Sequence, residues 1–136
     1  MNEAIRSSVR DRAPDCCEYC RAQARFSHDP FSVEHIIPIS KGGIDDLENL
    51  AWSCIGCNNF KFTAISAFDL VTTQMTPLFN PRTDIWNDHF RWSADFSEII
   101  GLTPIGRATL VRLQLNRPGL VNLRGVLKAA GKHPPE

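Results

Sequence analysis

Two short cysteine pairs decide the fold of this chain: Cys17-Glu18-Tyr19-Cys20 and Cys54-Ile55-Gly56-Cys57. The two-residue spacer in each pair lets both sulfurs approach one ion. Two such pairs supply the four thiolates of a closed tetrahedral zinc site, with Zn–S distances of about 2.3 Å. A redox-active motif and independently buried cysteines are the alternatives. Cys16 could replace Cys17, but only with a longer spacing to Cys20. The sequence therefore predicts a structural zinc on Cys17, Cys20, Cys54 and Cys57.

The composition around these pairs is that of a small globular protein. The chain has 136 residues, of which 43% are hydrophobic and 22% are charged, so a disordered chain and a coiled coil are excluded. No apolar run approaches the roughly 18 residues of a membrane span, and the first residues lack the apolar stretch of a signal peptide. We expect a cytoplasmic protein without a membrane partner. In that reducing compartment five cysteines favour metal binding over disulfides.

The first half of the chain predicts one helix, two strands and a second helix. A helix over residues 2–13 precedes the first cysteine pair. The β-branched segment 32–40 predicts a strand that ends near Pro38, and the loop 41–50 leads into a short second strand beginning at Leu50. Residues 58–71 predict a helix that starts from the second cysteine pair. These elements define an N-terminal unit over residues 1–75.

Residues 76–136 predict a C-terminal extension that packs on this unit. The prolines of 76–89 indicate an irregular segment, and 90–101 alternates as a β-hairpin does. Thr103 caps a helix that continues to about Leu115, and Pro118 opens another that ends near Gly131. The irregular segment is expected to be held by Leu78, Phe79, Ile85 and Trp86.

A third motif lies inside the loop that the zinc would close. Within the loop it consists of Val33-Glu34-His35-Ile36-Ile37-Pro38, Lys41-Gly42-Gly43 and Asn49-Leu50, and it ends just after the loop with Asn58-x-x-Lys61. Together with the cysteine pairs, this order resembles the zinc-stapled branch of the HNH endonucleases over about residues 15–62. The resemblance implies an α+β fold with a ββα-metal core, in which two strands and a helix hold a divalent ion against a scissile phosphate.

The resemblance also implies a role for four side chains. His35 would be the general base, and Glu34 would bind the catalytic metal. Asn49 would orient and polarise the histidine, and Asn58 would be a second metal ligand. Glu34 stands where many members have Asp, and Asn58 stands where the family name has His. Both departures keep an oxygen ligand, which suits Mg²⁺ or Mn²⁺.

The chemistry of these residues agrees with that assignment. An imidazole with an ordinary pKa near 6.5 can deprotonate water at neutral pH, and a divalent cation stabilises the charge that develops on a phosphate. Lys61 lies one helical turn after Asn58 and would contact a phosphate, as Arg82 and His89 would. A solvated Lys61, a packed His89, a turn-capping Asn49 and a merely packed His35 are the alternatives.

The charge distribution leaves the nucleic-acid partner open. Fifteen basic and fifteen acidic residues cancel over the whole chain. Residues 105–136, however, carry six basic residues and one acidic residue, which would suit a phosphate track or a solvated helix surface. We expect contacts to the backbone of double-stranded DNA, with weak sequence preference.

These observations together predict a metal-dependent endonuclease that hydrolyses DNA phosphodiester bonds. Its expected cofactors are a structural Zn²⁺ and a catalytic Mg²⁺ or Mn²⁺. A non-catalytic zinc module that binds nucleic acid or protein is the alternative, and the motif is also compatible with a nuclease that acts on RNA.

Overall fold

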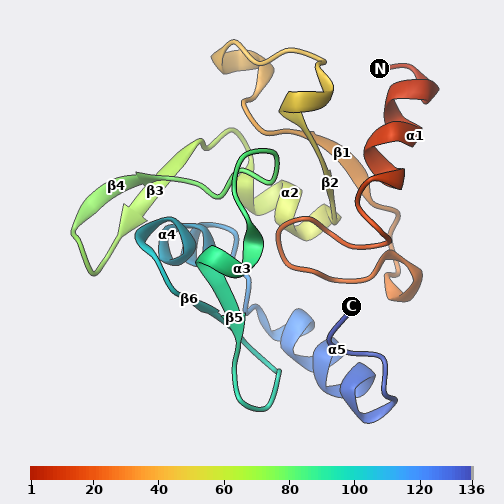
Figure 1. Cartoon of the computed structure of the whole chain (residues 1–136), viewed down its shortest axis with the longest axis vertical. Helices are drawn as coiled ribbons and strands as arrows, with labels where there is room; N and C mark the ends of the chain where they lie inside the picture. The colour runs from red at the N-terminus through yellow and green to blue at the C-terminus, as the bar shows by residue number, and fades with distance from the viewer. Residues whose placement is uncertain (136) are drawn as a thin grey trace.

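Three antiparallel two-stranded sheets and five α-helices make up residues 1–135, which are the residues that this computed structural model describes (Figure 1). The fold is therefore α+β, as predicted. The elements are α1 (Glu3–Asp11), β1 (Ser32–His35), β2 (Leu50–Ser53), α2 (Ile55–Lys61), β3 (Ser66–Asp69), β4 (Gln74–Pro77), α3 (Trp86–His89), β5 (Phe90–Trp92), β6 (Ile99–Gly101), α4 (Pro104–Arg112) and α5 (Pro118–Ala129).

The expected ββα order is present as β1, β2 and α2. The two strands are antiparallel, with His35 opposite Leu50. β1 ends at His35, slightly before the predicted end near Pro38, and a short 3₁₀ turn at Ile39–Lys41 follows Pro38. The Ile37 N–H donates to the Asn49 side chain at 2.8 Å instead of to a strand partner, and Pro38 has no N–H to donate, so the strand does not continue. The end of β1 thus carries His35 at the mouth of a loop.

Helix α2 is shorter than predicted and begins earlier. It starts inside the second cysteine pair, where the Cys54 sulfur accepts a hydrogen bond from the backbone N–H of Cys57 at 3.4 Å. It ends at Lys61, because Phe62 takes a non-helical backbone conformation with a positive φ of 51°. The prediction of a helix over 58–71 is therefore wrong beyond Lys61. The chain turns instead into the β3–β4 hairpin, which projects at the left of Figure 1.

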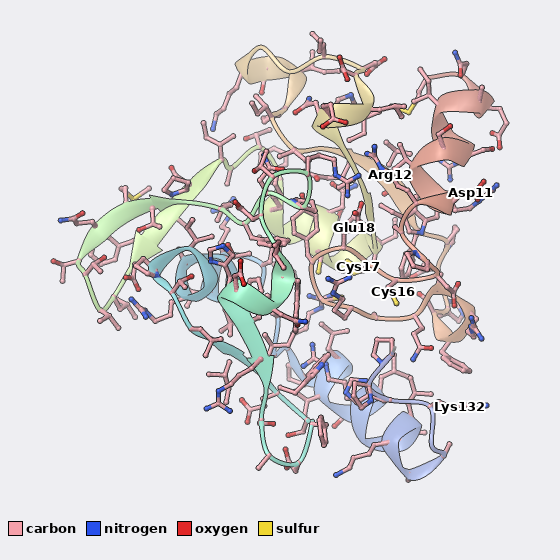
Figure 2. The ribbon with its side chains drawn as sticks, viewed as in Figure 1. Asp11, Arg12, Cys16, Cys17, Glu18 and Lys132 are labelled. Atoms are coloured by element: carbon pink, nitrogen blue, oxygen red, sulfur yellow. The ribbon has the colours of Figure 1, made fainter. Side chains whose placement is uncertain are left out.

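The N-terminal helix is fastened to the core by its last residues. The Asn2 side chain caps α1, and Val9 on the inner face is fully buried. Arg12, which follows the helix (Figure 2), donates to the carbonyl oxygens of Leu47 at 2.6 Å and Leu50 at 2.5 Å. α1 therefore holds the start of β2 in place.

The C-terminal extension follows the predicted order with two corrections. Residues 76–89 include the end of β4 and the short helix α3, and Ile85 is 65% exposed rather than buried. The β5–β6 hairpin is as expected. Thr103 caps α4 by accepting from the Gly106 N–H at 3.0 Å. The division at residue 75 stays a prediction, although it falls inside β4.

Both halves of the chain contribute to one hydrophobic core. Tyr19 and Trp52 from the first half belong to the same buried cluster as Phe79, Trp86 and Phe90 from the second. The indole N–H of Trp86 donates to the carbonyl oxygen of Tyr19 at 2.9 Å. The extension therefore packs directly against the first cysteine pair.

Among residues 1–135, no helix combines the length and the apolar composition that crossing a membrane requires.

Candidate metal centre and active site

The four predicted zinc ligands meet in one buried cluster. The sulfurs of Cys17, Cys20, Cys54 and Cys57 all lie within 4.8 Å of one another. The Cys20 and Cys54 sulfurs are 3.7 Å apart. A zinc tetrahedron with Zn–S bonds of about 2.3 Å has edges of about 3.8 Å, so the cluster has the size that zinc requires. The residues fit the ion.

Cys17 rather than Cys16 belongs to the cluster, as the spacing predicted. The Cys17 side chain points into the interior next to α2, whereas neighbouring Cys16 forms an isolated backbone bridge with Gln23 (Figure 2). Hydrogen bonding with the thiols of Cys17, Cys20 and Cys57 holds the pKa of Cys54 below its usual range. The pKa of Cys17 is also lowered, whereas hydrogen bonding with the neighbouring thiols raises the pKa of Cys20 and of Cys57.

A second group of polar side chains lines a shallow hollow of about 350 Å³ between the end of β1 and α2. Glu34, His35 and Asn58 all contribute to its wall. His35 Nε2 lies 2.6 Å from Asp45 Oδ1, and the Asp45 side chain is half exposed. When Nε2 donates to this carboxylate, Nδ1 is left as the ring nitrogen that can accept a proton. The structure therefore pairs the predicted base with an acid.

The carboxylate of Glu34 is engaged on both oxygens. Oε1 lies 2.5 Å from Lys61 Nζ, and Oε2 accepts from the Tyr19 hydroxyl at 2.6 Å. Glu34 is 3% exposed and Lys61 is 1% exposed. Burial raises the pKa of Glu34 against the opposing effects of the Lys61 charge and the hydrogen bonds from Lys61 and Tyr19. Glu34 and Lys61 form a buried ion pair.

This pairing bears on the catalytic metal. A hard cation such as Mg²⁺ needs carboxylate or carbonyl oxygens that are free to face it. Lys61 Nζ lies beside Oε1 and the Tyr19 hydroxyl donates to Oε2, so a catalytic ion at Glu34 would compete with both groups. Asn58 donates its amide N–H to the Ser32 hydroxyl at 3.1 Å, and its Oδ1 has no hydrogen-bond partner among residues 1–135.

Asn49 holds the backbone of a loop. Its Oδ1 accepts from the Ile37 N–H at 2.8 Å, and its amide nitrogen donates to the carbonyl oxygens of Ile37 and Ile44 at 3.0 Å each. Within the described chain these are its side-chain partners, and the His35 ring is not among them. Asn49 instead fixes Ile44, the residue immediately before Asp45.

The three residues predicted to bind substrate do not line the hollow. The Lys61 ammonium donates to the carbonyl oxygens of His35 at 3.3 Å and Ile36 at 2.9 Å in addition to pairing with Glu34. Arg82 forms an ion pair with Glu18. His89 Nδ1 lies 2.6 Å from the Thr103 hydroxyl. Each of these side chains has a partner within the protein, and their contact with a phosphate stays a prediction.

Sequence reasoning missed three partners of the site residues. Asp45 lies in an acidic run that reads as a solvated loop, and Tyr19 is a spacer residue between two cysteines. Arg117 belongs to the basic C-terminal segment but lies against the zinc cluster. The acidic run next to Gly42-Gly43 was the only available signal for Asp45, and nothing in the sequence singles out the other two.

Comparison with known proteins shows what the segment that carries the cysteines is similar to. Residues 17–62, about a third of the chain, match the family model described as HNH endonuclease. The match contains all four cysteines and every residue that lines the hollow except Thr63. Comparisons with curated proteins and with solved structures found no match. Residues 17–62 are therefore similar to the HNH endonuclease family, and the four cysteines within them are positioned to bind a metal.

Proposed function

We propose that this HNH domain hydrolyses DNA phosphodiester bonds with His35 as the general base. The observation that carries the proposal is the 2.6 Å pairing of His35 Nε2 with Asp45 at the wall of an open hollow. A histidine that only packs in a core needs neither a carboxylate on one ring nitrogen nor access to a cavity from its strand.

The pair can perform the proton transfer that hydrolysis requires. Asp45 accepts the Nε2–H of His35, which fixes the tautomer in which Nδ1 is unprotonated. Nδ1 then removes a proton from water as the water attacks phosphorus, the P–O3′ ester bond breaks, and the departing 3′ oxygen takes a proton from solvent. The carboxylate stabilises the imidazolium that results, as the acid does in other His–carboxylate pairs. Asp45 is a positioning residue, because it acts through His35.

Other side chains fix the backbone that carries this pair. Lys61 holds the carbonyl oxygens of His35 and Ile36, and Glu34 neutralises the Lys61 charge. Asn49 anchors the loop at Ile44, next to Asp45. A base must be held within a fraction of an ångström of its target, so this support favours a catalytic role for His35 over a merely structural one.

The proposal keeps Mg²⁺ or Mn²⁺ as the catalytic cofactor that the family resemblance implies. Such an ion supplies Lewis-acid stabilisation of the phosphate charge when it is bound. Asn58 Oδ1 at the hollow is the available oxygen ligand. Glu34 could join it only after releasing Lys61, because the ammonium lies at Oε1.

The test is cleavage of supercoiled plasmid by the zinc-loaded protein, with and without added Mg²⁺ or Mn²⁺. Omission of the added ion is a better control than EDTA, since EDTA also competes for structural zinc. We expect nicked or linear product only with the added ion. Cleavage of single-stranded RNA but not plasmid would redirect the proposal to RNA. Binding of DNA without cleavage of either substrate would favour a non-catalytic zinc module.

A further inference from the structure

Arg117 reaches the zinc cluster from the opposite end of the chain. It precedes α5, and its guanidinium lies against the second cysteine pair. Nη2 is 3.4 Å from the Cys54 sulfur, and Nη1 is 3.6 Å from the Cys57 sulfur. The guanidinium also lies over the Phe60 ring, with Cζ 5.5 Å from the ring centroid. One cation of the C-terminal extension therefore contacts two expected zinc ligands.

The second cysteine pair has space for this guanidinium because its spacer includes a glycine. Gly56 lies between the two cysteines in α2, and a Cβ at that position would come within 2.8 Å of Arg117 Cζ. Helix propensity alone favours alanine over glycine by about 1 kcal/mol. The absence of a side chain at position 56 thus serves the contact with Arg117 at the expense of local helix stability.

The charges at this contact are complementary. Four thiolates and one Zn²⁺ carry a net charge of about −2. Arg117 brings a positive charge to the sulfurs in a half-buried setting. Arg117 therefore places a positive charge against the sulfurs of a site that is negatively charged when zinc is bound.

The same guanidinium also fixes the end of α4. Nη1 donates to the carbonyl oxygens of Leu113 at 3.2 Å and Gln114 at 3.3 Å. These residues immediately follow α4, and Arg117 itself begins the turn into α5. The sulfur cluster and the connection between two C-terminal helices thus share one side chain.

We propose that Arg117 strengthens zinc binding by donating hydrogen bonds to the Cys54 and Cys57 sulfurs, so that zinc binding and docking of the C-terminal helices stabilise each other. The coupling is reciprocal, because a contact that favours the loaded site must favour equally the docked state of α5 in the presence of zinc. The role is independent of nuclease activity and is testable in a protein that cleaves nothing.

The test measures zinc affinity by competition with a chromophoric chelator. Arg117→Gln removes the charge and is expected to weaken zinc binding about 10- to 100-fold, the usual effect of losing a residue that hydrogen-bonds a metal ligand. Arg117→Lys should give an intermediate value, because it keeps the charge but not the paired N–H groups. Arg91→Gln is the matched control, since Arg91 is exposed on β5 and donates to the Trp92 carbonyl oxygen. Equal affinity for Arg117→Gln and Arg91→Gln would overturn the proposal.

Gly56→Ala gives a second test that leaves Arg117 and all cysteines in place. The added methyl group displaces the guanidinium while improving helix propensity, so zinc affinity should fall although the helix is favoured. Hydrogen exchange should then show lower protection across α5 in the zinc-loaded variant than in the zinc-loaded parent. Unchanged zinc affinity and unchanged α5 protection in Gly56→Ala would contradict the coupling, even if Arg117→Gln fails to fold.

Discussion

His35 and Asp45 show how one side-chain contact can define the reactive form of a residue. Asp45→Asn keeps the size of the side chain but removes the charge that stabilises the imidazolium, and it no longer favours one tautomer. We expect the cleavage rate at saturating DNA to fall at least about 10-fold with little change in KM. Glu48→Gln is the matched control, because Glu48 is an exposed acid in the same segment. A rate equal to that of the control would remove Asp45 from the mechanism.

Glu34 and Lys61 form a buried pair whose two members depend on each other. Lys61→Met leaves the Glu34 carboxylate buried without its cation, which should lower the free energy of unfolding by about 3–5 kcal/mol. Glu34→Gln combined with Lys61→Met removes both charges and keeps an acceptor for Tyr19, so most of this loss should be recovered. Urea unfolding measures both variants. A double variant no more stable than Lys61→Met would show that the pair is not the source of the loss.

Residue identities at the site could be predicted from spacing, but several of their contacts could not. Cys-x-x-Cys spacing identifies zinc ligands because two sulfurs on one tight turn must face the same point. The pairing of His35 with Asp45 depends on the path of the intervening loop, which Asn49 fixes through backbone contacts. The burial of Lys61 likewise depends on how α2 packs against β1, and a lysine is ordinarily exposed.

A bidentate ion pair between Asp69 and Arg107 links the β3–β4 hairpin to α4. Arg107 Nε and Nη2 lie 3.0 Å from the two Asp69 carboxylate oxygens. Hydrogen bonding with Arg107 holds the pKa of Asp69 below its ordinary value. A lowered pKa contributes stability above the unfolded-state value of about 3.9, and that stability is lost as the pH falls through the folded-state value.

Asp69→Asn should therefore be less stable than the parent at pH 7 and should lose less stability on acidification below about pH 4. Thermal unfolding across this pH range measures the difference. Asp11→Asn, at an exposed acid at the end of α1, is the control. The account of this hairpin fails if Asp69→Asn and the control show the same acid dependence.

The same hairpin marks where prediction of the elements failed. Residues 58–71 have enough apolar positions for a helix, and sequence periodicity does not show where such a helix stops. The helix ends because Phe62 has a positive φ. Such a backbone conformation is common for glycine and rare for phenylalanine, so the sequence does not predict it. The β5–β6 hairpin was predictable from the alternation of apolar and polar residues over 90–101. The start of α4 was predictable because Thr103 and Pro104 mark it locally.

At the scale of the whole molecule, the rest of the chain supports residues 17–62, the segment that matches the HNH endonuclease family model. Glu18 in the first cysteine pair is held by Arg82, the Tyr19 carbonyl oxygen by Trp86, and the sulfurs of the second pair by Arg117. All three supporting residues lie in the C-terminal extension. The basic residues of that extension are accordingly used in part inside the protein, rather than as an open track for phosphates.

The most direct test of the central claim is a comparison of plasmid cleavage by the zinc-loaded parent, His35→Ala and His28→Ala in the presence of Mg²⁺ or Mn²⁺. His28 is an exposed histidine outside the hollow and serves as the matched control. We predict that His35→Ala keeps its fold and zinc content but loses at least about 10²-fold in rate, whereas His28→Ala cleaves as the parent does. Cleavage by His35→Ala at the parental rate would contradict the assignment of His35 as the base.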